Sequence, residues 1–278
     1  IFGEQMEKCG VDYFDYYLIH AMSAERYDLY RDCGAFEIIP QLKREGRVRH
    51  FGMSFHDKAE VLDRILTEQP ELEFVQLQFN YLDYEDPVVE SRKCYEVCVK
   101  HGKRVSVMEP VKGGALAELP EDAGAILDAL DGGSHASYAL RFAEGFENVY
   151  MVLSGMSSIE QMRDNLATMS DFRPLGETEL AAVRKVAETL RGKGAIPCTA
   201  CRYCTSGCPM GIDIPSFFSC YNSKVMFGRP QSSERYAELV KKGTGPNDCM
   251  TCGHCEEVCP QHLRIRSLLR DVAEEFDA

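Results

Sequence analysis

The pattern of apolar and polar positions divides the first part of the chain into short and long segments. Short apolar runs, bounded by charged or Gly- and Pro-containing turns, predict strands at residues 13–20, 48–55, 74–80, 104–109 and 149–154. Longer stretches with helical periodicity predict helices at residues 35–45, 58–68, 88–101, 136–144 and 158–168, with Asp57 and Ser157 as expected N-caps. The alternation of strand and helix indicates an α/β segment with a parallel sheet.

A further amphipathic stretch separates this segment from the C-terminal part of the chain. Apolar residues recur on one stripe of residues 176–191, and Gly192 and Gly194 follow, which predicts a connector helix that ends there. We therefore expect an α/β domain over residues 1–172, a connector over 173–195 and a small domain over 196–278. Inside the small domain, apolar-periodic stretches at residues 215–224 and 235–242 separate two copies of one cysteine motif.

Charge and hydropathy exclude several kinds of partner. The net charge of −13 comes from the first segment, since residues 1–187 hold 20 Lys and Arg against 33 Asp and Glu, whereas residues 188–278 hold 11 of each. An acidic domain without a basic stripe repels phosphate backbones, so we expect no nucleic-acid partner. No apolar run approaches the roughly 20 residues of a membrane span, and no signal peptide is visible, so we expect no membrane partner and a cytoplasmic location.

Eight of the thirteen cysteines form two copies of the pattern C-x₂-C-x₂-C-x₃-C-P. Three thiolates at two-residue gaps allow one loop to wrap three corners of a 4Fe-4S cluster, while the fourth cysteine reaches the other cluster. The spacing therefore predicts two interlocked 4Fe-4S clusters. The expected ligands are Cys198, Cys201, Cys204 and Cys259 for one cluster, and Cys249, Cys252, Cys255 and Cys208 for the other.

Two other interpretations of the cysteines are open. Zinc would join two separated C-x₂-C pairs, which leaves the third cysteine of each copy without a use. The clusters could also serve only as cross-links that stabilise a small domain. Residues 196–278 resemble the α-helical ferredoxin family, on the strength of the segments Pro197-Cys-Thr-Ala-Cys-Arg-Tyr-Cys204 and Ile212-Asp-Ile-Pro215. That resemblance implies helices between the two motifs.

Residues 1–170 resemble the aldo/keto reductases. The resemblance rests on Gly10-Val-Asp-Tyr-Phe-Asp-Tyr-Tyr-Leu-Ile-His20, Leu42-Lys-Arg-Glu-Gly-Arg-Val-Arg-His-Phe-Gly-Met-Ser54, Gln76-Leu-Gln-Phe-Asn-Tyr-Leu-Asp83 and Gly155-Met-Ser-Ser-Ile-Glu-Gln-Met-Arg-Asp-Asn165, in that order. It implies an incomplete (β/α)₈ TIM barrel, with the small two-cluster domain attached as in a ferredoxin-tailed branch of the family. In such barrels the chemistry takes place at the carboxyl ends of the strands.

The resemblance also implies roles for individual residues. His20 matches the histidine that orients and polarises the substrate carbonyl, and Ser54 and Gln76 match positions that hold the nicotinamide carboxamide. On the last crossover, Gln161 and Asn165 match adenosine-side positions, and Gly155 and Ser157 lie on the loop before them. A helix N-terminus there favours a diphosphate, although Gln161 and Asn165 could equally be solvated helix surface.

One loop suggests an anion site without reference to the family. Lys112 and Gly113 follow a predicted strand within Met108-Glu-Pro-Val-Lys-Gly-Gly114, where a cation and exposed N–H groups suit an anionic cofactor. We therefore include Lys112 and Gly113 among the expected cofactor-binding residues. His56 follows the strand of Ser54 and could face the same site.

The match also has departures. The family's catalytic aspartate and tyrosine lie near its second strand and its lysine on the third, whereas Ile1 falls inside what resembles the third crossover helix. We therefore expect a fragment of a longer reductase. Phe55 and Met108 replace an asparagine and an aromatic residue common in the family, which leaves NADP, NAD or another cofactor open.

Two functions follow from these expectations. The first is an oxidoreductase that uses a nicotinamide on a small-molecule substrate while two clusters exchange electrons with a redox partner protein. Hydride carries two electrons and a cluster passes one at a time, so a flavin could be required between them. The second is an electron-transfer or redox-sensing protein whose barrel is a non-catalytic scaffold.

Overall fold

The computed structural model describes residues 1–198, 200–259 and 261–277. It divides into two compact units. The first comprises Ile1–Glu118 and Leu130–Val183, and the second comprises Leu119–Ala129 and Arg184–Ala278. The grouping of Leu119–Ala129 with the C-terminal residues is a discontinuity that our predicted boundaries did not include.

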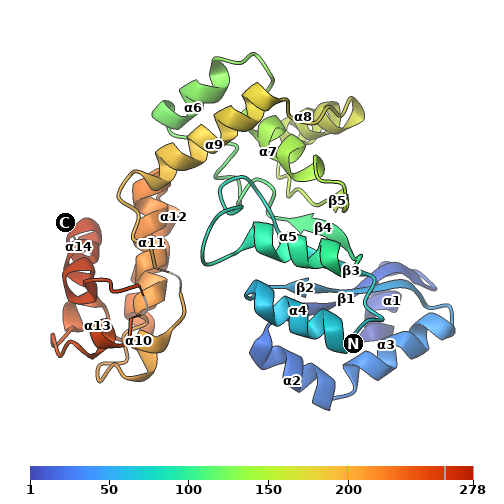
Figure 1. The fold of residues 1–278 in the computed structure, drawn as a ribbon, viewed down its shortest axis with the longest axis horizontal. Coiled ribbons are helices and arrows are strands. Elements are labelled where there is room, and N and C mark those ends of the chain that lie inside the picture. The colour runs from blue at the N-terminus through green and yellow to red at the C-terminus, as the bar shows by residue number, and fades with distance from the viewer. Residues whose placement is uncertain (199, 260, 278) are drawn as a thin grey trace. The chain divides into compact units, whose positions relative to one another are not determined.

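The first unit is built on a parallel sheet of five strands in sequential order, β1-β2-β3-β4-β5 (Figure 1). The strands are β1 (Phe14–Met22), β2 (Val48–Phe55), β3 (Phe74–Gln78), β4 (Arg104–Met108) and β5 (Val149–Val152), and every neighbouring pair is parallel. All five predicted strands are confirmed, and each end either matches its prediction or differs from it by at most two residues. Sequential parallel order is the arrangement from which a (β/α)₈ barrel is made.

Most of the helices between the strands were also predicted. They are α3 (Ala35–Arg44), α4 (Ala59–Glu68), α5 (Ser91–Lys100), α7 (His135–Glu144) and α8 (Ile159–Ser170). The helix α1 (Phe2–Cys9) agrees with the expectation that the sequence begins within a crossover helix, whereas α2 (Ala24–Asp32) and α6 (Glu121–Asp128) were missed. The helix α2 shows no clear apolar stripe, since it buries Tyr27 alone.

The two predicted N-caps were wrong by one position. Ser158 caps α8, and its hydroxyl accepts a hydrogen bond from the backbone N–H of Gln161 at 3.2 Å. Lys58 is the residue before α4, and the Asp57 carboxylate accepts from its N–H at 2.8 Å. Asp57 still serves a cap-like purpose, because its other oxygen accepts from the N–H of Ala24 at 2.8 Å, in the first turn of α2.

The sheet contains a buried apolar row, is covered by helices and curls towards a barrel. Met53, Val75 and Val105 lie in register on neighbouring strands and are fully buried. The helix α3 packs on β2, and α5 packs on β3 and β4 (Figure 1). The ring of Tyr16 on β1 lies 5.3 Å from that of Tyr150 on β5. Because β1 and β5 are the two edge strands, this contact shows that the sheet curls into a partial barrel.

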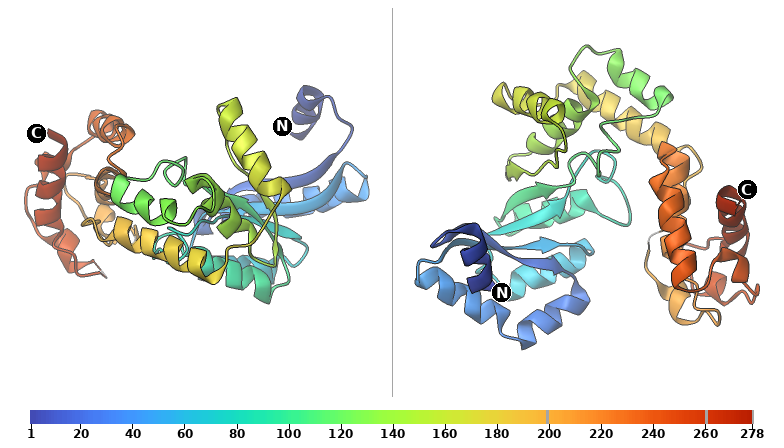
Figure 2. Two further views of the ribbon diagram at one scale, coloured as in Figure 1. Left: turned by 90° about the horizontal axis from the view of Figure 1, so that it is seen from above. Right: turned by 180° about the vertical axis from the view of Figure 1, so that it is seen from behind.

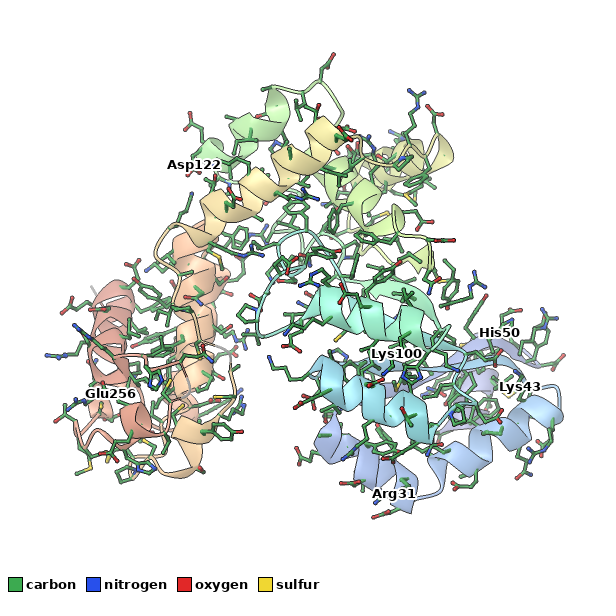
Figure 3. All side chains as sticks on the ribbon, viewed as in Figure 1. Arg31, Lys43, His50, Lys100, Asp122 and Glu256 are labelled. Atoms are coloured by element: carbon green, nitrogen blue, oxygen red, sulfur yellow. The ribbon has the colours of Figure 1, made fainter. Side chains whose placement is uncertain are left out.

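Glu73, which precedes β3, connects α3 to β2. Its carboxylate lies 2.5 Å from Lys43 Nζ, 3.0 Å from His50 Nδ1 and 3.1 Å from the backbone nitrogen of Phe51, which donates to it. Lys43 and His50 are labelled in Figure 3. Partial burial would raise the pKa of Glu73, but the hydrogen bonds from these three groups outweigh it and lower the pKa below its ordinary value.

Replacing Glu73 with glutamine should make the free energy of unfolding depend less on pH in the acidic range. A depressed carboxyl pKa stabilises the fold above the unfolded pKa, near 4.3, and that stabilisation is lost as the pH falls through the folded pKa. We expect Glu73→Gln to lower the free energy of unfolding by about 1 kcal/mol at neutral pH, and by progressively less below about pH 4. Urea unfolding at several pH values measures this. Glu71→Gln, at an exposed carboxylate two residues away, is the control, and an equal effect would contradict the assignment.

The second unit is a small helical domain. Its long helices are α11 (Ile214–Phe227), α12 (Gln231–Lys242) and α14 (Ile265–Asp277), and α11 packs against both of the others (Figure 2, orange and red). Phe217, Phe218 and Leu269 form part of its core. The connector helix predicted at 176–191 is present as α9 (Glu177–Arg191). Within the described residues, no helix combines the length and the apolar character that crossing a membrane requires.

Candidate functional site

The two cysteine loops of the second unit have left-handed backbone at two matching motif positions. In the first loop Ala200 and Arg202 have φ of 50° and 65°, and in the second Thr251 and Gly253, at matching motif positions, have φ of 59° and 88°. Left-handed backbone is unfavourable for residues other than glycine, by roughly 1–2 kcal/mol each. Its recurrence at the same positions indicates that each loop must turn in this way to bring its cysteines together.

Each loop continues into a one-turn helix that carries the third cysteine of its motif. Cys204 lies on α10 (Tyr203–Ser206) and Cys255 on α13 (His254–Glu257). Both are buried, and burial raises the pKa of both thiols to about 11. A thiolate in such a place requires a compensating positive charge, which a metal centre supplies.

Two cavities lie against these loops, and each is lined by four cysteines drawn from both motifs. One cavity is lined by Cys198, Cys201, Cys204 and Cys259. The other is lined by Cys249, Cys252, Cys255 and Cys208. The fourth cysteine of each motif therefore lies at the cavity of the other motif. We call these the Cys198 cavity and the Cys249 cavity.

The donor set of each cavity fits a group of several atoms. Four cysteines line each cavity. Among the described residues, no three or more His, Cys, Asp or Glu side chains close around the position of a single metal ion. Four cysteines that line one cavity match the ligand set of a 4Fe-4S cluster.

Most of the remaining lining is apolar, apart from one arginine at each cavity and Gln261 at the Cys198 cavity. Arg202 lines the Cys198 cavity and Arg266 the Cys249 cavity. Each guanidinium pairs with a carboxylate: Arg202 with Asp213 at 3.3 Å, and Arg266 with Glu256, labelled in Figure 3, at 2.8 Å. Ile214, which is fully buried, lines both cavities, so a single side chain forms a wall between them.

A close contact also joins the two loops. Gly207 precedes Cys208, and a Cβ atom at Gly207 would lie 2.0 Å from Nε2 of His254, on the other loop. The absence of a side chain at Gly207 therefore makes room for the His254 ring. This contact brings the segment of Cys208 beside the loop that supplies the other three cysteines of its cavity.

Replacing Gly207 with alanine should displace the His254 ring and loosen the Cys249 cavity. Because the ring is exposed and can swing away, we expect a modest cost of about 1 kcal/mol in stability and faster loss of half of the bound iron to a chelator. Iron release followed by absorbance measures this. Gly243→Ala, where a Cβ meets nothing within 4 Å, is the control. Equal release rates in both variants would show that the contact is unimportant.

The first unit gathers polar residues at the carboxyl edge of its sheet. Ser54 lies in register with Gln76, and Gln76 with Ser106, so these three form a polar row on one face. Ser54 is buried and its hydroxyl accepts from the backbone N–H of Ala21 at 2.7 Å. That bond ties the β2 residue to the end of β1, where His20 is exposed. The structure thus brings His20, Ser54 and Gln76 to one edge.

Lys112 is engaged by a residue that the sequence did not reveal. Its Nζ lies 2.6 Å from Oδ1 of Asp83, whose side chain is 1% exposed. The other Asp83 oxygen accepts from Gln78 at 2.7 Å and from Asn80 at 2.8 Å. Lys112 and Gly113 both have left-handed backbone, with φ of 48° and 58°. The positive charge expected to face an anionic cofactor is therefore already paired with a buried carboxylate.

The predicted adenosine-side residues lie together at the start of α8. The Gln161 side-chain oxygen accepts from the backbone N–H of Ser157 at 2.7 Å, and Asn165 donates to the Ser154 hydroxyl at 3.0 Å. Gly155, Ser157 and Gln161 are exposed. These contacts shape the loop and engage one polar atom of each of the two side chains within the protein.

A parallel sheet with polar residues at its carboxyl edge, followed by two crossed cysteine quartets, defines an α/β barrel segment followed by a module of the iron–sulfur type. Residues 1–188 match the aldo/keto reductase family, and residues 197–263 match the 4Fe-4S dicluster domain. The chain therefore belongs to the aldo/keto reductase family and carries a 4Fe-4S dicluster domain.

Individual relatives agree with both assignments. An aldo-keto reductase from Bacillus halodurans in its holo form is 23% identical, with a TM-score of 0.54 over 66% of this chain and 65% of that one. One from Klebsiella pneumoniae, in complex with NADPH, is 20% identical, with a TM-score of 0.52 over 67% and 63%. These likenesses establish the fold, and the chain spans just under two thirds of both structures. One of the subunits of the fumarate reductase (CoM/CoB) from Methanothermobacter marburgensis is 36% identical over 72 residues, which are 24% of this chain and 14% of that protein.

Proposed function

We propose that the protein is an oxidoreductase whose second unit holds two 4Fe-4S clusters and exchanges single electrons with a redox partner protein. The observation that carries this proposal is the pair of crossed cysteine quartets, each around its own cavity. When bound, each cluster accepts or gives one electron at a time. A cytoplasmic location belongs to the same proposal, because exposed thiolate ligands persist in reducing compartments.

The placement of the two quartets supports electron transfer rather than a purely structural role. Ile214 lines both cavities, so the two clusters would lie close enough for rapid exchange. Each quartet includes one exposed cysteine, Cys201 in the first and Cys252 in the second. Clusters held at these positions would lie near the surface, where a partner protein can approach them. A cross-link that served only stability would need neither feature.

For the first unit we propose binding of NADP or NAD beside a small-molecule substrate. Ser54 and Gln76 would hold the nicotinamide carboxamide, and His20 would orient and polarise a substrate carbonyl at the same edge. Because hydride carries two electrons and each cluster passes one, a flavin or a substrate that tolerates single-electron steps would have to connect the two reactions.

A second candidate is a non-catalytic barrel that serves as a scaffold for the electron-transfer module. The contacts of Lys112 with Asp83, and of Gln161 with Ser157, favour it, because these groups already bind one another. The two candidates differ in whether a nicotinamide delivers electrons to the clusters.

Anaerobic mixing with NADPH, followed by visible absorbance, separates them. In the oxidoreductase, NADPH bleaches the cluster absorbance, and Gln76→Ala slows the bleaching while dithionite still reduces both proteins fully. Dithionite is the control for cluster integrity. If dithionite reduces the clusters but NADPH and NADH neither bind to the protein nor reduce its clusters, the result would support the non-catalytic scaffold.

A further inference from the structure

Three basic side chains gather at the carboxyl ends of β1 and β2. His20 lies near the end of β1, His56 follows β2 directly, and Arg26 lies in the first turn of α2. The backbone N–H of His56 donates to the Met22 carbonyl at 2.9 Å. The Arg26 guanidinium reaches the Ala21 carbonyl at 3.5 Å. Hydrogen bonds to the end of β1 therefore hold Arg26 and His56 near His20.

The local backbone is shaped to produce this arrangement. The pairing of β1 with β2 is irregular between Ile19 and Met22. Within that interval Ala21 adopts left-handed backbone, with φ of 54°. A bulge of this kind re-aims side chains and is common beside active sites. The hydrogen bond from Ala21 to Ser54 stabilises it and places the basic side chains next to the expected nicotinamide position.

The three basic groups act on one another electrostatically. Partial burial lowers the pKa of His56, and the charges of His20 and Arg26 lower it further. The neighbouring carboxylate, Asp57, accepts the backbone N–H groups of Ala24 and Lys58, both at 2.8 Å. The Asp57 carboxylate therefore already accepts hydrogen bonds at the starts of α2 and α4. A bound anion would relieve the mutual repulsion of the three basic groups.

We propose that Arg26 and His56 form a subsite for a carboxylate, next to the carbonyl position at His20, so that the substrate is a small carbonyl acid. The inference rests on the proposed function for the carbonyl, whereas anion binding rests on the arrangement alone. A carboxylate is favoured over a phosphate because the expected diphosphate position, on the loop after β5, lies at the opposite edge strand. A planar guanidinium beside an imidazole suits the two oxygens of a carboxylate.

The test uses the anaerobically purified full chain with its clusters oxidised, and acetate as the probe. Histidine resonances are followed by NMR as acetate is added, with acetamide, its uncharged analogue, added to a second sample at matched ionic strength. We expect acetate, but not acetamide, to shift the resonances of His20 and His56 with one saturation curve and to raise the pKa of His56.

Two variants and a control make the test specific. Arg26→Gln and His56→Gln should each weaken acetate binding about tenfold or more. His50→Gln, on the same strand as Ser54 but at the other end of the sheet, should leave it unchanged. Equal binding of acetate and acetamide, unchanged binding in both variants, or tighter binding of inorganic phosphate than of acetate would each overturn the proposal. Cluster reduction by NADPH in a protein that ignores acetate would refute this inference and leave the proposed function intact.

Discussion

A double variant, Cys208→Ser with Cys249→Ser, is expected to retain about four iron atoms per chain, half of the eight expected for two clusters. Cys208 and Cys249 belong to different motifs but line the same cavity. Both changes therefore damage one cluster and leave the Cys198 cavity untouched. By contrast, Cys198→Ser with Cys208→Ser changes two cysteines of one motif that line different cavities, and should lose nearly all iron.

The comparison is informative because an uncrossed arrangement predicts the opposite. If each motif bound its own cluster, the pair Cys198 and Cys208 would affect one cluster and the pair Cys208 and Cys249 would affect two. Iron and acid-labile sulfide, measured after anaerobic purification, decide between these outcomes. Cys9→Ser, at an exposed cysteine of the first unit, is the control and should retain all iron.

Removing the Asp83 carboxylate should destabilise the first unit by about 3 kcal/mol. This is the size of effect expected when one partner of a buried ion pair is deleted. Asp83 is 1% exposed and accepts from Lys112, Gln78 and Asn80. Asp83→Ala would leave three donors without an acceptor, one of them charged. Adding Lys112→Leu or Lys112→Met to the Asp83→Ala variant should restore part of the lost stability.

Urea unfolding measures this effect, with tyrosine fluorescence as the signal because the chain has 13 Tyr and no Trp. The matched control is Asp63→Ala. Asp63 pairs with Lys100 at 2.8 Å, but its side chain is 37% exposed, so its loss should cost about 1 kcal/mol or less. If Asp83→Ala cost no more than Asp63→Ala, the buried pair would have no special importance.

The sheet could be predicted because each strand is a short apolar run with turn residues on both sides. The signal depends on local sequence alone, so it placed every observed strand. A helix that buries little of itself carries no such signal, which is why α2 was missed. The caps were misplaced by one residue; at α8 the reason is that adjacent residues, Ser157 and Ser158, offered equivalent polar side chains.

The site was predictable where its spacing is short and regular. The interlocked cysteine motifs specify two quartets without knowledge of the helices between them, and the cavities are lined accordingly. The pair of Lys112 and Asp83 is different, because 29 residues separate its members. Their contact depends on β3 and β4 being neighbours and on left-handed backbone at Lys112, and neither is visible as a local pattern.

The central claim is that the second unit holds two 4Fe-4S clusters. Iron and acid-labile sulfide quantified on anaerobically purified protein, with an EPR spectrum after dithionite reduction, test it most directly. The account predicts about eight iron and eight sulfide per chain, and a spectrum broadened by two neighbouring reduced clusters. Stoichiometric zinc, or metal-free protein that cannot be reconstituted, would contradict it.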